Sequence, residues 1–113
     1  MIKNMSRTII APKSLRAKHF GYVLPNGVKC VLVHDDTVKM PAVAMSIHTG
    51  QLNDPVLLPG LAHFCEHMLF MGTTKFPSES EYSSFVTKHN GYTNAFTSDQ
   101  ATSYYFSVSE AAL

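Results

Sequence analysis

The front of the chain alternates apolar and polar positions on both sides of a turn sequence. Residues 19–24 alternate weakly, and residues 28–34 are rich in valine and leucine. The Pro-Asn-Gly triplet at residues 25–27 lies between them, where asparagine or glycine can adopt the positive φ of a tight turn. We therefore predict a β-hairpin. Residues 42–49 predict a third strand, which Gly50 ends.

A helical pattern follows the third strand after a loop that contains prolines. Residues 60–71 predict a helix, and Gly72 is placed to end it. Ser78 predicts the start of a second helix, because Glu81 follows it at the three-residue spacing of a capping box.

Two further strands are predicted at residues 94–97 and 102–108, the second rich in aromatic and β-branched side chains. The resulting order, β-β-β-α-α-β-β, is typical of an α+β fold in which an antiparallel-rich sheet carries helices packed on one face. Residues 109–113 resemble an N-cap and the first turn of another helix. A single turn is not stable alone, so we expect the fold to be incomplete at the C-terminus.

Composition limits the classes of protein to which the chain can belong. Its 113 residues suffice for one small domain, and 45% hydrophobic with 15% charged residues describe a globular chain. The net charge of +1 gives no reason to expect a nucleic-acid partner. No apolar run approaches the roughly 18 residues that a membrane span needs, so no membrane partner is expected either.

Positive charge is concentrated at the N-terminus, where all residues before Asp35 lack a carboxylate side chain. We interpret residues 1–18 as a basic N-terminal arm and residues 19–113 as the domain. A basic, serine-containing start is also typical of a mitochondrial transit peptide, but Pro12 and the lack of an amphipathic repeat favour a surface arm. Cys30 and Cys65 make no disulfide framework, so a reducing, cytoplasmic location is expected, with the mitochondrion as the alternative.

The first predicted helix places its polar side chains on one side. His63, Glu66 and His67 share that side with Phe70. The opposite side is apolar and consists of Leu61, Phe64, Cys65, Met68 and Leu69. Apolar residues on both sides predict a mostly buried helix, in which two imidazoles and a carboxylate need partners. A metal ion would be a suitable partner for all three side chains.

The spacing of these side chains supports a metal site with catalytic chemistry. His63 and His67 are four residues apart, so both rings can reach one ion. Glu66 could take a proton from a water bound to zinc, which lowers the pKa of that water to about 7. His-x-x-Glu-His is a signature of one class of zinc peptidases. The alternative is a helix whose histidines form ordinary hydrogen bonds.

A catalytic zinc site usually has three protein ligands. Six side chains of the right type could supply the third here, but none has diagnostic spacing: His34, His48, Glu79, Glu81, His89 and Asp99. Each is more commonly a solvated acid or a histidine at the end of a strand or helix, so the residues alone leave the third ligand open.

The sequence around the motif resembles the insulinase (pitrilysin-type, inverzincin) family of zinc metallopeptidases. The resemblance covers about residues 19–113, and it identifies them as the front half of a catalytic domain. Its segments are Leu24–Val28, Asp54-Pro55, Gly60–Ala62, His63–His67, Met68–Thr73, Lys75–Pro77, Glu81-Tyr82, Asn94–Thr97 and Thr102–Phe106.

The resemblance implies roles for the residues of the motif. His63 and His67 would be zinc ligands, and Glu66 would be the general base. The third ligand in the family is a glutamate on a later helix, which this resemblance places beyond the end of the chain. The resemblance therefore implies a zinc-dependent metalloendopeptidase, although the 113-residue chain alone is expected to be inactive.

The same resemblance implies a peptide substrate. Asn94 and Ala95 match positions that bind the peptide as an added β-strand, a mode in which main-chain hydrogen bonds accept varied sequences. Phe70 matches the wall of a substrate pocket, with core packing as the alternative. Expected partners are the peptide and the remaining domains of a full-length enzyme. The alternatives for the function are a non-catalytic peptide-binding or regulatory relative and a truncated gene fragment.

Overall fold

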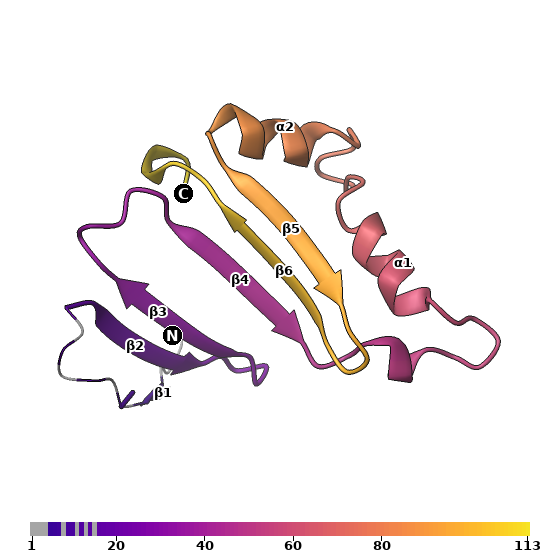
Figure 1. Ribbon diagram of the computed structural model, residues 1–113, viewed down its shortest axis with the longest axis horizontal. Coiled ribbons are helices and arrows are strands. Elements are labelled where there is room, and N and C mark those ends of the chain that lie inside the picture. Colours follow the sequence, from indigo (N-terminus) through magenta and orange to yellow (C-terminus); the bar gives the residue numbers. More distant parts are fainter. Residues whose placement is uncertain (1–4, 8, 11, 13, 15) are drawn as a thin grey trace. The chain divides into compact units, whose positions relative to one another are not determined.

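The computed structural model describes residues 5–7, 9, 10, 12, 14 and 16–113 (Figure 1). The chain divides into two compact units, one up to Val38 and one from Lys39 to Leu113. In the described residues each unit has a three-stranded antiparallel sheet, and the second unit also carries two α-helices. No helix in these ranges is long and apolar enough to cross a membrane.

The first unit contains the predicted hairpin. Gly27 has a φ of 88° in the turn, and its N–H donates a hydrogen bond to the carbonyl oxygen of Leu24. A short strand precedes the hairpin and pairs with it, so that part of the predicted arm 1–18 belongs to the sheet; the rest of the arm lies partly outside the described residues. The sheet has the order β1-β2-β3, with strands Met5–Arg7, Lys18–Val23 and Lys29–His34.

The sheet of the second unit has the order β4-β6-β5, so that the last strand along the chain lies in the middle. β5 pairs only with β6 among the described residues and is therefore an edge strand. These strands span Ala42–Ile47, Thr102–Ser107 and Tyr92–Thr97.

Two helices, α1 (Leu61–Met68) and α2 (Glu81–Lys88), pack on one face of this sheet. Thr93 and Thr97 are on the same face of β5, and they form hydrogen bonds to Tyr82 of α2 and Glu66 of α1, respectively. The predicted α+β fold, with helices on one face of an antiparallel sheet, is confirmed.

The ends of the helices differ from the predicted ones. α1 ends at Met68, and the residues after it form turns up to Gly72, whose φ is 100°. The predicted capping box is wrong: α2 begins at Glu81 after the N-cap Ser80, whose side chain forms no capping hydrogen bond. A turn at Ser78 delays the start, because Glu81 N–H donates to the carbonyl oxygen of Ser78. The predicted final helical turn is a 3-10 helix, Glu110–Ala112.

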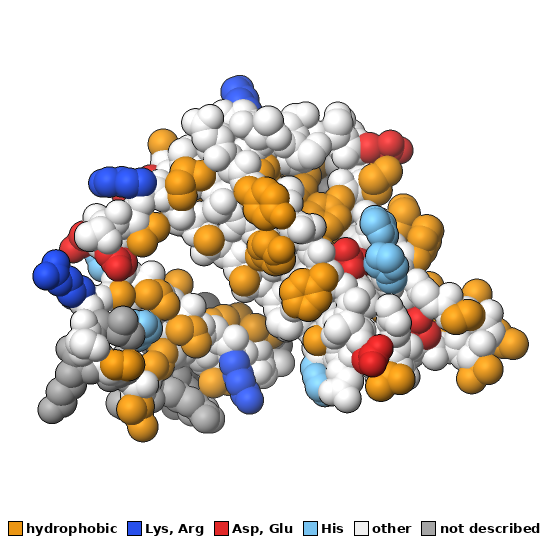
Figure 2. Space-filling model, viewed as in Figure 1, with side chains coloured by type: hydrophobic (Ala, Val, Ile, Leu, Met, Phe, Trp, Pro, Cys, Tyr) orange, Lys and Arg blue, Asp and Glu red, His pale blue; other side chains and the backbone are white. Residues whose placement is uncertain are grey.

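The prediction of a mostly buried α1 is also wrong. Glu66 is its one buried residue, whereas Phe64 is 62% exposed and Met68 is 48% exposed. The physical reason is that α1 contacts the sheet along one side alone, and the rest of the second unit places no second layer over the other side. Figure 2 likewise shows apolar side chains gathered at the surface of the second unit.

The loop before α1 is fixed on the hairpin between β5 and β6. Gly50 is buried there, and a Cβ atom at this position would lie 2.2 Å from the carbonyl oxygen of Ser98. This close approach allows Gln51 N–H to donate to Ser98 and Leu52 N–H to donate to Asp99. Only glycine fits here without movement of the backbone. The contact therefore sets where α1 begins relative to the sheet.

Candidate metal centre

Helix α1 is capped by a side chain from the preceding loop. Its N-cap residue, Gly60, has a φ of 88° and no side chain that could accept a hydrogen bond. Asp54 replaces that acceptor: Gly60 N–H donates to Oδ2 at 2.7 Å, and Ala62 N–H donates to Oδ1 at 2.8 Å. The carboxylate thus satisfies free N–H groups and interacts favourably with the positive end of the helix dipole.

Replacing Asp54 with alanine is expected to loosen α1 by about 1–2 kcal/mol, the usual cost of losing a helix cap. Hydrogen–deuterium exchange of the α1 amides would then be about 5–30-fold faster. Asp54→Asn keeps one acceptor oxygen and should show a smaller effect. Unchanged exchange in the alanine variant would mean that the cap contributes nothing to helix stability.

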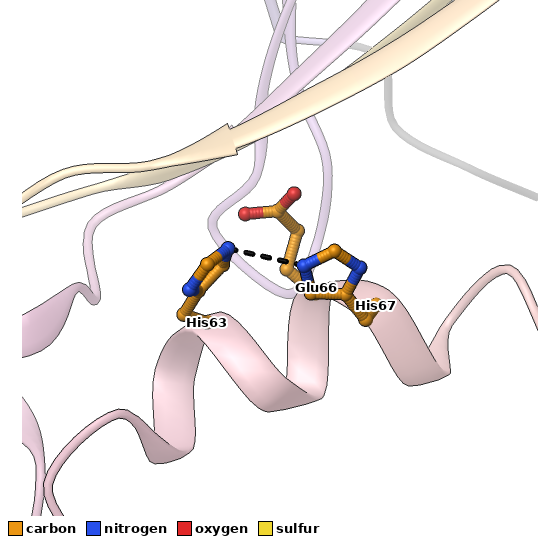
Figure 3. A group of neighbouring side chains, drawn as sticks. All are labelled: His63, Glu66 and His67. Carbon is orange, nitrogen blue, oxygen red and sulfur yellow. Dashed lines mark hydrogen bonds between the residues drawn. The ribbon is translucent and has the colours of Figure 1, made fainter.

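His63 and His67 are neighbours on successive turns of α1, and both are exposed (Figure 3). Their Nε2 atoms lie 3.1 Å apart, and the ring centroids lie 4.7 Å apart. Two nitrogen ligands at tetrahedral zinc, each at about 2.1 Å, are about 3.4 Å apart. The observed separation therefore fits two ligands that converge on one ion.

Glu66 is the buried member of the group, with 7% of its surface exposed. In Figure 3 its carboxylate points away from the helix on the side of the two imidazoles. Thr97 Oγ1 donates a hydrogen bond of 2.5 Å to Glu66 Oε2, a length typical of a charge-assisted bond between a hydroxyl and a carboxylate. In the described part of the chain, no hydrogen bond reaches Oε1.

The ligand atoms of His63, Glu66 and His67 all lie within 4.8 Å of one another. Two imidazoles and a carboxylate are a donor set suited to zinc. The prediction that these three side chains come together is thus confirmed. Electrostatically, burial raises the pKa of the nearby Tyr104 phenol, and Cys65 and Glu66 raise it further.

The five alternative third ligands that belong to the second unit do not extend this group. Within the second unit, no histidine or acidic side chain beyond His63, Glu66 and His67 joins the cluster. His89 instead lies at the end of α2, where its Nδ1 is 2.7 Å from the carbonyl oxygen of Phe85. In the first unit, His34 Nε2 lies 2.9 Å from an oxygen of Asp36. These two histidines have the ordinary roles that were expected.

The predicted substrate residues lie next to the motif helix. Asn94 and Ala95 belong to the edge strand β5, which contacts α1. Phe70 is half-buried just after α1, and its ring centroid lies 5.5 Å from that of Tyr82 and 6.1 Å from that of Tyr104. It also lines an apolar cavity of about 390 Å³ between α2 and β6. Phe70 therefore packs in the core and lines a cavity, and its role toward substrate stays a prediction.

Two residues of the site were missed as functional residues, namely Asp54 and Thr97. Both belong to segments that carry the family resemblance, but spacing does not indicate their contacts. The signal for Thr97 is weak: it shares the alternate positions of β5 with Thr93 and Ala95, the half-buried ones. That alternation predicts that Thr97 lies on the helix-covered face, but it does not predict the contact with Glu66.

Comparison with known proteins gives consistent matches. The family model of insulinase (peptidase family M16) matches residues 29–113. The chain is 45% identical over 112 residues to the insulin-degrading enzyme of Mus musculus, covering 99% of this chain. It is 50% identical over 91 residues, or 80% of this chain, to a candidate zinc protease of Caenorhabditis elegans. A crystal structure of pitrilysin matches 99% of this chain with a TM-score of 0.90 at 32% identity.

The chain spans a small part of these relatives. It covers 11% of the mouse enzyme and 11% of the Caenorhabditis elegans protein, and 12% of the pitrilysin chain. The matched residues include the His63–His67 motif and the strands that surround it. The chain belongs to the insulinase family of peptidases.

Proposed function

We propose that this chain supplies zinc ligands and the general base of a metalloendopeptidase that hydrolyses peptides. The observation that carries the proposal is the grouping of His63, Glu66 and His67, whose ligand atoms lie within 4.8 Å of one another on a helix fixed against a sheet edge. Membership of a family of peptidases supports it.

His63 and His67 would hold Zn²⁺ through their Nε2 atoms. When bound, zinc supplies Lewis-acid chemistry that polarises a peptide carbonyl and lowers the pKa of a water. Glu66 accepts a proton from the attacking water at Oε1, because its Oε2 is already held by Thr97. The family resemblance implies that the third protein ligand would be a glutamate on a later helix.

Peptide binding in this proposal uses the free edge of β5. A peptide added as a strand there would lie beside α1, since α1 contacts β5. Asn94 and Ala95 would contact its main chain, and Phe70 would contribute to the wall of a side-chain pocket. Such binding selects for extended backbone rather than for one sequence.

The direct test is peptide hydrolysis by the full-length protein under control of its metal content. Internally quenched fluorescent peptides should be cleaved, cleavage should stop after zinc is removed with a chelator, and added Zn²⁺ should restore it. A peptide-binding relative without catalysis would bind the same peptides and leave them intact, which would overturn the proposal. Cleavage that survives complete removal of metal would also overturn it.

A further inference from the structure

The carboxylate of Glu66 is tied to the sheet by one hydrogen bond. Thr97, the last residue of β5, donates it from Oγ1 to Oε2, across 31 residues of sequence. Because Glu66 is 93% buried, this bond is shielded from water, which strengthens it. The bond therefore constrains the rotation of the carboxylate more than a surface contact would.

Thr97 is itself held firmly. It pairs with Thr102 of β6 across the hairpin, and Thr102 is 6% exposed. The Thr102 hydroxyl donates to the carbonyl oxygen of Thr49 at 2.8 Å, which ties β6 to the chain segment just before Gly50. The branched side chain of Thr97 also has few rotamers. The position of the Thr97 hydroxyl is therefore restricted even without its bond to Glu66.

The position of Glu66 makes such a constraint useful. Glu66 lies three residues after His63 and one before His67, and its carboxylate lies close enough to both imidazoles to bind the same ion. A carboxylate that ligates the metal cannot also serve as a free proton acceptor. Metal binding and proton acceptance therefore exclude one another at Glu66. The hydrogen bond from Thr97 occupies one of the two carboxylate oxygens, Oε2.

We infer, resting on the proposed function, that Thr97 is a positioning residue whose hydrogen bond restrains Glu66 as a proton acceptor and disfavours its coordination of the metal. The hydroxyl keeps Oε2 directed at the sheet and leaves Oε1 free for the proton. Its removal releases the carboxylate toward His63 and His67. Metal binding then persists while proton transfer is impaired.

The test compares Thr97→Val, which removes the hydroxyl at nearly constant shape, with Thr97→Ser, which retains it. In the full-length protein, Thr97→Val is expected to lower kcat about 10–100-fold, the usual range for residues that orient the groups of a metal site, with little change in KM. Thr97→Ser should restore most of kcat. A kcat of Thr97→Val equal to that of the unmodified protein would overturn the inference.

Thr93→Val is the matched control. Thr93 lies four residues earlier on the same face of β5, and its hydroxyl bonds to Tyr82 rather than to Glu66, with Oγ1 2.8 Å from the phenolic oxygen. Its loss removes a comparable tie between helix and sheet, so it should alter stability without a selective loss of kcat. An equal loss of kcat in both variants would reduce Thr97 to a structural role and overturn the inference.

Metal binding gives a readout that does not need turnover. Zn²⁺ affinity of Thr97→Val should equal or exceed that of the unmodified protein, and the visible spectrum of its Co²⁺ form should change as Glu66 becomes a ligand. The change should disappear in the double variant Thr97→Val/Glu66→Gln. A weaker affinity, or a spectrum that does not depend on Glu66, would overturn the inference. If the unmodified protein cleaves no peptide, the proposed function fails, but this metal readout still decides the role of Thr97.

Discussion

Replacing Glu66 with glutamine should reduce peptide hydrolysis by the full-length protein at least about 100-fold while zinc stays bound, because general-base catalysis contributes about 10²–10⁴-fold. The amide has nearly the same shape as the carboxylate but cannot accept a proton at neutral pH. Its carbonyl oxygen can still accept the hydrogen bond from Thr97, so the packing between α1 and β5 should survive.

The measurement is kcat/KM with a fluorescent peptide, together with the zinc content of the purified variant. Glu79→Gln serves as the control, because Glu79 is an exposed glutamate outside the metal group. It should keep full activity. Retention of half the activity by Glu66→Gln would rule out the proposed role as base, and loss of zinc would instead assign Glu66 to the ligand set.

Removing either imidazole should have a comparably large effect on metal binding. His63→Ala and His67→Ala each leave one histidine of a pair whose Nε2 atoms are 3.1 Å apart. Loss of a residue that merely orients a ligand costs about 10–100-fold in metal affinity, so loss of a ligand should cost at least about 100-fold. Both rings are exposed, and their removal should leave the fold of the helix intact.

Competition with a chromophoric zinc chelator would measure this affinity, and circular dichroism would check the fold. His89→Ala is the matched control, since His89 is a half-buried histidine at the end of the other helix and outside the metal group. It should bind zinc as the unmodified protein does. Full zinc stoichiometry in the double variant His63→Ala/His67→Ala would exclude this site.

The parts of the structure that depend on nearby residues could be predicted from the sequence. The hairpin follows from the Pro-Asn-Gly turn, and the turn indeed has Gly27 at positive φ. The grouping of His63 and His67 follows from helical geometry, since residues four apart share a face whatever surrounds the helix. Local rules of this kind need no knowledge of tertiary packing.

The parts that failed depend on contacts distant in sequence. The burial of α1 was misjudged because a helix pattern does not reveal how many layers cover it, and the rest of the second unit covers one side of α1 alone. The cap of α1 was missed because Asp54 lies six residues before Gly60, outside the spacing of local capping motifs. Thr97 was missed because its contact with Glu66 depends on where β5 lies against α1.

The same distant contacts determine when the site can assemble during synthesis. The anchor of Glu66 comes from a residue 31 positions later, and that anchor depends on pairing between β5 and β6. A growing chain that has emerged from the ribosome only as far as α1 already carries both histidines and lacks the strand that orients the carboxylate. Orientation of the Glu66 carboxylate therefore requires the β5–β6 hairpin to have formed, whereas both histidines are already present on α1.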